Sequence, residues 1–434
     1  MKKNKGITLV ALVVTIVVLL ILAGVSINLV LGNNGIIAKA QEAKTKSAEA
    51  SENDLKGMNG LVSEMEGALA GNGGAGGSGT GTKVPAEATA ETAPYFPDHT
   101  FTKKEGTIDT GLVIQDASGN EYVWVVVPRT TAVYKTTGLG KTAFTDADYT
   151  SIEKDLKDYT STYVTRDGYS DTYVADDKNV GWFADATAYN NLKNSMLKSV
   201  YENGGFYVGR YEAGIGTNRT SNIDKNSEEK YITPSTAPVT KADAYPYTYV
   251  TRTQAQNLAS NVNSGTKTSS LMFGVQWDLV LAFMSKDTAK VTDTRKLTSN
   301  STTIGNYRNS VFQLSQTGKY ATMSAYNLSS TWNPSTTPTA NFVDTSRNKI
   351  AQSSNGNGIL VTTGTSETNK VMNIYDIAGN VWEWTLEKTS NTSGPCTCRG
   401  GSFNGAGSSG PAAVRGINSP DSSSYGIGFR VSLF

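Results

Sequence analysis

An uncharged stretch of 21 residues near the N-terminus constrains this chain more than any other feature. It runs from Ile7 to Ile27 and follows three lysines within residues 1–6. A helix of about 20 apolar residues crosses the roughly 30 Å hydrocarbon core of a membrane. Lysines that precede such a helix stay in the cytoplasm, so the chain after Asn28 is expected outside. The sequence therefore predicts a membrane-anchored protein whose bulk lies on the extracellular face.

The beginning of this stretch resembles the leader of type IV prepilins, which is cut after a glycine and keeps its apolar helix. Gly6, followed by residues 7–10 (ITLV), carries the resemblance. Such pilins have Glu at the fifth mature residue, where this chain has Ala11, so assembly into a pilus is left open. A Sec signal peptide is disfavoured because its apolar region spans only about 7–15 residues. Residues 1–6 are interpreted as a prepilin-like leader, with a plain membrane anchor as the alternative.

A long helix and a linker are expected to follow the leader. Residues 7–70 are predicted as one transmembrane and stalk helix, because residues 38–54 are rich in Ala, Lys and Glu and apolar residues recur every three or four positions from Leu55 to Leu69. This stripe suits packing on a pilin-like subunit or a solvated stalk. Residues 71–98 contain Gly, Ser and spaced prolines and are predicted to be a linker.

Composition excludes several function classes. The formal net charge is +1, so there is no electrostatic footprint for nucleic acid. The chain has one His (His99) and two Cys (Cys396 and Cys398), which excludes His-rich zinc sites, Ser-His-Asp triads within a core and a disulfide framework.

Residues 99–434 are expected to form one α+β domain. A turn signal, DASGN at 116–120, lies between two apolar runs and predicts a hairpin over 113–127. Helix patterns are expected at about 192–200, ended by Gly204-Gly205, and again from Thr251 to about Val262 and from Gly274 to Met284. A polar stretch at about 130–185 is interpreted as a surface insertion.

Four segments near the C-terminus carry a family resemblance. They are NIYDIAGNVWEW (373–384), RGGSF (399–403), Arg415 and GIGFRV (426–431). In this order they resemble the formylglycine-generating-enzyme family, a branch of the C-type lectin-like fold. The resemblance covers about residues 100–434, and it implies that fold for the domain behind the pilin-like helix.

The resemblance does not bring the family's catalytic residues with it. The copper-dependent enzymes use two cysteines after the RGGS segment, and the matching positions here are Gly405 and Gly410. Cys396 and Cys398 precede that segment, and a reactive thiolate needs a nearby cation or helix N-terminus. No catalytic residue is assigned, and the protein is expected not to be an enzyme.

The resemblance also implies calcium as a structural cofactor. The turn that matches the family's calcium site supplies the side chains of Asp376 and Glu383 and the carbonyl oxygens of Gly379 and Val381. Hard oxygen donors of this kind suit calcium. The alternative interpretation makes Glu383 a satisfied buried acid and Trp382 and Trp384 ordinary core residues.

The last 46 residues have an unusual composition. Residues 389–434 contain no Lys, Glu, Gln, Met or Trp, although Met occurs 8 times and Trp 6 times in the chain. Most residue types present there can be reached from an Asn codon of form AAY by replacing adenines, whereas the five missing types cannot. This pattern resembles the variable region of a diversity-generating retroelement target protein. An ordinary Ser/Gly-rich loop is the alternative.

The sequence therefore predicts a surface-displayed binding protein whose variable tail, 389–434, faces a protein or glycan ligand on another cell or a phage. Two alternatives stay open, an oxidative modifying enzyme of the same family and a structural minor pilin or pseudopilin. The candidate ligand-binding residues are Asn404, Gly405, Ala406, Ser408, Ser409, Val414, Gly416, Ile417, Asn418, Ser422, Tyr425 and Gly426.

Overall fold

The computed structural model describes most of the chain after the predicted linker. The described residues are 94–174, 183–217, 236–315, 317–324, 327–328, 332–334 and 358–434. The predicted leader, transmembrane and stalk helix and most of the linker lie outside them, as does the whole of a separate N-terminal unit that ends at Ser78. Within the described ranges, no helix has the length and apolar character needed to span a bilayer.

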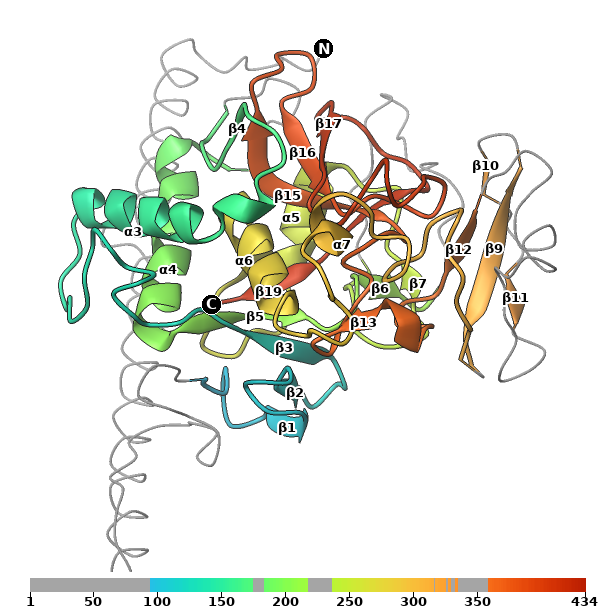
Figure 1. Cartoon of the computed structure of the whole chain (residues 1–434), viewed down its shortest axis with the longest axis horizontal. Helices are drawn as coiled ribbons and strands as arrows, with labels where there is room; N and C mark the ends of the chain where they lie inside the picture. The colour runs from blue at the N-terminus through green and yellow to red at the C-terminus, as the bar shows by residue number, and fades with distance from the viewer. Residues whose placement is uncertain are drawn as a thin grey trace, which may run out of the picture. The chain divides into compact units, whose positions relative to one another are not determined.

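A six-stranded sheet forms one side of the domain (Figure 1). Its order is β1 (Thr102–Glu105), β2 (Val113–Gln115), β3 (Glu121–Val126), β5 (Gly205–Gly209), β19 (Val431–Leu433) and β8 (Ser269–Leu271). The predicted hairpin is confirmed, because β2 and β3 pair in antiparallel fashion. In the turn between them, Asp116 accepts hydrogen bonds from the main chain and the side chain of Asn120.

A second sheet carries the tail. It contains β17 (Arg415–Asn418), β16 (Cys396–Arg399), β15 (Trp382–Thr389) and β18 (Ile427–Phe429) in that order, with β4 (Tyr169–Ser170) paired to β15. The pair of β15 and β18 is parallel, so the chain must cross over between β17 and β18 instead of turning directly.

Helices pack between and beside the sheets. They are α3 (Asp146–Tyr159), α4 (Ala186–Asn203), α5 (Arg252–Ala259), α6 (Gly274–Met284) and α7 (Arg295–Thr298), with short 3-10 turns η1 (Ser161–Tyr163) and η3 (Glu367–Asn369). Every residue of α6 is buried, and the helix contacts both β3 and β15. A helix that is buried on all sides lies inside a core. The helix α6 therefore forms part of the core between the two sheets.

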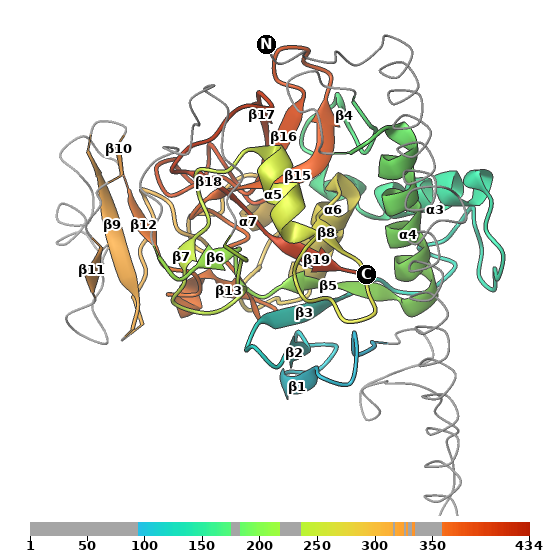
Figure 2. The same ribbon diagram turned by 180° about the vertical axis from the view of Figure 1, so that it is seen from behind.

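Smaller strand pairs complete the domain. They are β6 (Gly214–Ile215) with β7 (Tyr245–Pro246), β13 (Lys370–Val371) with β14 (Ile374–Tyr375), and a sheet of β9 (Lys319–Ser324), β10 (Asn327–Leu328), β11 (Asn333–Pro334) and β12 (Ile359–Val361). Figure 2 shows this last sheet on the side opposite α3 and α4.

Two sequence expectations need adjustment. The packed domain begins before residue 99, because Tyr95 lies in the core and its carbonyl oxygen accepts a hydrogen bond from the Tyr207 hydroxyl (2.7 Å). The polar stretch at about 130–185 contains the helix α3, whose N-cap Thr145 forms a reciprocal capping box with Asp148.

The predicted helix that ends at Gly204 is confirmed as α4, and Gly204 adopts the left-handed conformation (φ 73°) that glycine favours.

Candidate functional site

Two connections after β16 and β17 lie together at one end of the second sheet. Residues 400–414 link β16 to β17, and residues 419–426 link β17 to β18 (Figures 1 and 2). The connections touch each other, because Asn404 Nδ2 donates to the Tyr425 hydroxyl (3.3 Å). The ring of Tyr425 also packs edge-on against Phe403, with 6.1 Å between the centroids. The tail thus forms a continuous surface instead of two separate loops.

The accessibility of the candidate ligand-binding residues varies. Ser408, Ser409 and Ile417 are exposed, and Ile417 retains 47% of its surface. The half-buried members are Asn404, Gly405, Ala406, Gly416, Asn418, Ser422 and Tyr425. The two buried members are Val414, which is 8% exposed, and Gly426.

Three of these candidates are therefore corrected to structural positions. Val414 and Gly426 are buried, and the carbonyl oxygen of Gly426 accepts a hydrogen bond from Trp382 N (2.8 Å) where β15 and β18 begin to pair. At Gly416 an added Cβ would lie 2.9 Å from Cys398 Sγ and 3.1 Å from the Trp382 ring. Contacts this close leave no room for a side chain at Gly416.

Four buried charged side chains hold both ends of the first connection. Arg399 ends β16 and Arg415 begins β17, and their Nη2 atoms reach Asp278 of α6 at 2.7 Å and 2.6 Å. The Nε of Arg415 also lies 2.9 Å from Glu387 of β15, and Arg399 Nη1 lies 3.4 Å from the same carboxylate. We call Asp278, Glu387, Arg399 and Arg415 the buried quartet. It clamps residues 400–414 to the core.

Apart from the bond between Asn404 and Tyr425, the hydrogen bonds from residues 400–414 to the rest of the domain are made by main-chain atoms. Gly405 O accepts from Arg308 N (3.0 Å), and Gly407 O accepts from Ser301 N (3.1 Å). Bonds of the same kind join Trp277 Nε1 to Ala412 O (2.9 Å) and Ala413 N to Leu297 O (2.9 Å). By contrast, the side chains of Ser408 and Ser409 make no hydrogen bond to any described residue. Changing those side chains therefore breaks none of the bonds that hold the loop.

Trp382 belongs to this surface, whereas the alternative interpretation of the sequence made it a core residue. It is half-buried, whereas Trp384 is fully buried and donates through Nε1 to Val250 O (3.0 Å). Trp382 lies beside Gly416, and an added Cβ at Gly410 would approach its ring at 3.9 Å. Its position as the first residue of β15, before the strand enters the core, was the available signal.

Residues 161–170 flank the tail and were not predicted to do so. Thr165 Oγ1 donates to Ala413 O (3.3 Å), and the Tyr169 hydroxyl donates to Arg415 O (3.1 Å). Strand β4 also pairs with the end of β15. The long sequence separation of these contacts hides them from any local pattern.

The predicted calcium residues lie in a second buried charged cluster. Arg430 donates to both oxygens of Glu383, with its Nη2 2.6 Å from Oε1. Asp376 accepts from Gly364 N (3.0 Å) and Asn369 Nδ2 (3.1 Å). Glu212 accepts from Asn380 Nδ2 (2.6 Å) and Val381 N (3.1 Å). We call Glu212, Asp376, Glu383 and Arg430 the acidic cluster.

The acidic cluster has the charge and the donor atoms that a cation prefers, but its carboxylates are not arranged as a ready metal site among the described residues. Its three carboxylates outnumber the one guanidinium by two, and burial raises the pKa values of Glu212, Asp376 and Glu383. Two buried amide oxygens beside the turn, Asn306 Oδ1 and Asn369 Oδ1, accept no hydrogen bond from the part of the chain that the structure describes. Oxygen donors and an excess of negative charge suit calcium, although Glu383 would have to share its oxygens between the ion and Arg430. Among the described residues, no group of three or more His, Cys, Asp or Glu is arranged to hold a metal.

The cysteines do not resemble a reactive pair. Both are buried and free, and burial raises the pKa of Cys398 to about 12 although Asn418 Nδ2 donates to its Sγ (2.8 Å). A thiol with so high a pKa carries almost no thiolate near neutral pH. The two positions that match the family's catalytic cysteines, Gly405 and Gly410, carry no side chain.

Comparisons with known proteins match the C-terminal part of the chain. Residues 305–433 match the family described as the sulfatase-modifying factor enzyme 1-like domain. The resemblance drawn from the sequence motifs is thereby confirmed for this part, which includes β15 to β19 and the tail. No curated protein matches the chain.

Two solved structures are similar at a low level. Treponema denticola variable protein 1 is 15% identical with a TM-score of 0.27, covering 53% of this chain and 84% of that one. CarF is 13% identical with a TM-score of 0.28, covering 52% of this chain and 85% of that one. Similarity at this level is too low to carry a function from either protein to this chain.

Proposed function

We propose that residues 404–425 form the ligand-binding surface of a non-catalytic protein displayed outside the cell. One observation carries the proposal: the connection 400–414 is held by its main chain and by the buried quartet, while its exposed side chains, Ser408 and Ser409, make no hydrogen bond to the described residues. A surface of this kind accepts new side chains without losing its fold. A loop held rigidly also loses less entropy when it binds.

The composition of the tail supports diversification of this surface. Residues 389–434 lack the five residue types that adenine replacement in an AAY codon cannot produce. The exposed positions of the tail hold Ser, Asn, Thr, Asp and Ile, whereas the buried positions hold the arginines and Phe403 and Phe429 that support the fold. We infer that adenine-directed mutagenesis rewrites the exposed positions, as in diversity-generating retroelement targets.

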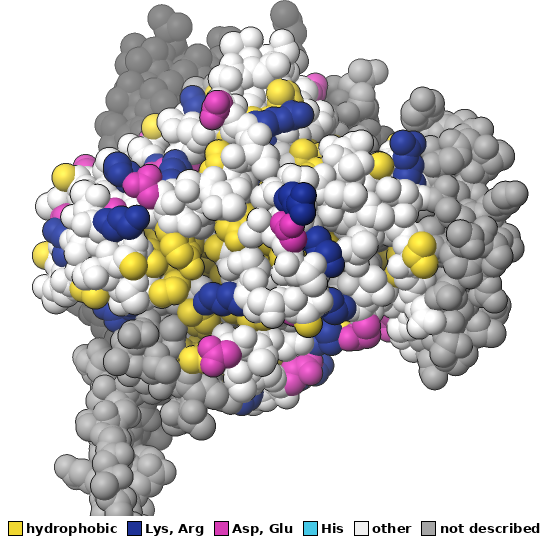
Figure 3. Space-filling model, in the orientation of Figure 1, with side chains coloured by type: hydrophobic (Ala, Val, Ile, Leu, Met, Phe, Trp, Pro, Cys, Tyr) yellow, Lys and Arg dark blue, Asp and Glu magenta, His cyan; other side chains and the backbone are white. Residues whose placement is uncertain are grey.

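The partner is a protein or a glycan on another cell or a phage. Ile417, Tyr425 and Trp382 supply apolar contact area, and Trp and Tyr are typical anchors of protein interfaces. The face in Figure 3 is mostly uncharged polar surface with cations and acids interspersed, which disfavours nucleic acid. Attachment to the membrane, and any packing with pilin-like subunits, rests on residues 1–70, which lie outside the described residues.

We also propose structural calcium at the acidic cluster. Asp376 and the carbonyl oxygens of Gly379 and Val381 would hold the ion, with Glu383 shared with Arg430. The ion would offset the excess negative charge around the turn that leads into β15, and so stabilise the base of the binding surface.

The alternative activity, oxidative modification by a copper enzyme, would need Cys396 and Cys398 as ligands. The raised pKa of Cys398 disfavours it. A copper-binding assay on the protein and on the double variant Cys396→Ser/Cys398→Ser separates the two functions. Copper bound by the protein and lost in the variant would favour the enzyme.

Deep sequencing of the DNA that encodes residues 389–434, in a population of the source organism, tests the proposal directly. We expect variation at adenine-derived codons for residues such as Ser408, Ser409 and Ile417, with Arg399, Arg415 and Arg430 unchanged. A uniform sequence with no template copy nearby would contradict diversification and leave a protein of fixed specificity.

A further inference from the structure

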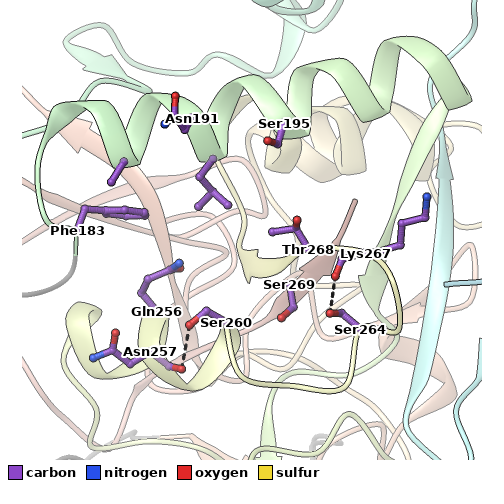
Figure 4. Close-up of a pocket in the computed structure, with 12 residues that line it drawn as sticks. Phe183, Asn191, Ser195, Gln256, Asn257, Ser260, Ser264, Lys267, Thr268 and Ser269 are labelled. Atoms are coloured by element: carbon purple, nitrogen blue, oxygen red, sulfur yellow. Dashed lines mark hydrogen bonds between the residues drawn. The ribbon is translucent and has the colours of Figure 1, made fainter. Parts of the chain in front are cut away.

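A cleft of about 570 Å³ lies between α4 and α5, and none of its lining residues belongs to the tail. Figure 4 shows Gln256 extending from α5 into this space, with Ser195 of α4 and Thr268 and Ser269 at the approach to β8 around it. Its volume falls within the range of about 300–1,000 Å³ typical of small-molecule sites. Phe183 and Leu192 add apolar surface at one end.

Gln256 is a fixed hydrogen-bond donor in the cleft. The residue is 4% exposed, and its Oε1 accepts bonds from Leu271 N (3.1 Å) and Ser270 Oγ (3.2 Å). A main-chain N–H can only donate, so the amide oxygen must face Leu271 and the Nε2 must face the other way. That Nε2 has no partner among the described residues and points into the space between the helices (Figure 4).

The other polar side chains that line the cleft are hydroxyls, the amides of Asn191 and Asn257, and one lysine. The side chains of Ser195, Thr268 and Ser269 make no hydrogen bond to the described residues, so each can donate to and accept from a ligand. The one charged lining residue, Lys267, places its Nζ 4.2 Å from the centroid of the Tyr95 ring. The cleft thus offers neutral hydrogen-bond donors and acceptors beside apolar side chains. A ligand that carries hydroxyl groups on its edge and C–H groups on its faces matches this arrangement.

We propose that this cleft is a second, constant binding site for a neutral oligosaccharide. Its lining contains no Asp or Glu, and glycoside hydrolysis uses a pair of carboxylates, so the site binds sugar without cleaving it. The site does not depend on the proposed function of the tail, since no residue after Ser269 lines it. A fixed sugar contact would hold the protein on a glycan surface while the tail binds its own ligand.

Saturation-transfer NMR with the full-length protein tests this site, using cellotriose, maltotriose and the trimer of N-acetylglucosamine as probes. Ser195→Trp fills the cleft from an exposed helix position, and Asn190→Trp is the matched control because Asn190 is exposed on α4 but does not line the cleft. We expect transfer from the protein to at least one probe, weakened at least tenfold by Ser195→Trp and kept in Asn190→Trp.

Two results would overturn the proposal. The first is no transfer to any of the three probes at about 10 mM, with a folded protein confirmed by circular dichroism. The second is equal transfer in the two tryptophan variants, which would place any sugar binding elsewhere. A third variant, Thr268→Val, keeps the side-chain shape and removes one hydroxyl, so a weaker signal there supports direct hydrogen bonding.

Discussion

The fold buries two clusters of charged side chains that include arginines of the tail, and the two clusters differ in charge balance. The buried quartet pairs two carboxylates with two guanidinium groups, so each charge has an opposite neighbour. The acidic cluster sets three carboxylates against Arg430 alone. A balanced cluster can act as a permanent clamp, whereas an unbalanced one needs protons or a cation to become neutral. The difference separates the part of the site that is fixed from the part that responds to solution conditions.

Breaking the balanced cluster should have the largest effect. In Arg399→Met, Asp278 and Glu387 keep only Arg415, and the free energy of unfolding is expected to fall by about 3–5 kcal/mol because a buried charge loses its partner. Denaturation in urea measures the change. The matched control is Arg295→Met, which removes the exposed ion pair with Asp293 and should not change the midpoint. Equal midpoints for the two variants would contradict the clamp.

Adding calcium tests whether a cation balances the acidic cluster. We expect the thermal midpoint to rise with calcium and to fall with a chelator, by an amount that corresponds to about 2.7 kcal/mol when calcium is 100-fold above its Kd. Magnesium serves as the control ion because it prefers a smaller octahedral shell. If the thermal midpoint is the same with calcium and with the chelator, calcium does not neutralise the cluster, and protonation of its carboxylates must do so instead.

Two glycines of the connection 400–414 test which of its positions are packed against the core and which have room for a side chain. An added Cβ at Gly407 would lie 2.4 Å from Thr302 N, whereas one at Gly405 meets nothing closer than 3.5 Å. Gly407→Ala is expected to cost about 1–3 kcal/mol because the main chain must move. Gly405→Ala should stay within about 0.5 kcal/mol. Urea denaturation of both variants measures the two losses of stability. A larger loss for Gly405→Ala than for Gly407→Ala would contradict the packing described for these glycines.

The pH dependence of stability sharpens the contrast between the two clusters. Burial, and then the nearby Asp376 and Glu383, raise the pKa of Glu212 well above its usual value. The folded state therefore favours the protonated form, and this stabilisation is lost as pH rises through the raised pKa. Glu212→Gln keeps a neutral side chain, so it should gain stability relative to the unchanged protein as pH rises, by at most about 1.4 kcal/mol per pH unit. A difference independent of pH between about 4.5 and 8 would contradict the raised pKa. Saturating calcium should reduce the slope.

Changes at the exposed positions should have the smallest effect on stability. Replacing Ser408 and Ser409 by Tyr, singly, is expected to change the free energy of unfolding by no more than about 0.5 kcal/mol each. The measurement is again urea denaturation, with Val414→Tyr as the contrasting variant because Val414 is buried. A loss at the serines as large as the loss at Val414 would contradict main-chain anchoring.

Much of the fold could be predicted from local patterns. The hairpin of β2 and β3 follows from a turn signal between apolar runs, and α4 ends where Gly204 provides a left-handed cap. The helix α3 was missed because its capping box uses Asp148 where the familiar signal is Glu or Gln, and its polar composition suggested a loop.

The candidate surface was found by composition and refined by packing. The missing residue types of 389–434 pointed to this part of the chain, and the family match to 305–433 supports the motifs around it. Neither composition nor motifs could show that Val414, Gly416 and Gly426 are packed more tightly than their exposed neighbours. That separation depends on Arg399, Cys398 and Trp382, which are close in space and not adjacent to them in the sequence.

The amino-acid sequence by itself determined the apolar stretch at 7–27, the family motifs and the biased composition of the tail, because each is a property of consecutive residues. Only the tertiary structure decided which charges are paired, which glycines have room for a side chain and that residues 161–170 border the tail. These features arise from contacts between strands and helices far apart in the chain, and burial makes their energies depend on every neighbour. No local pattern contains that information.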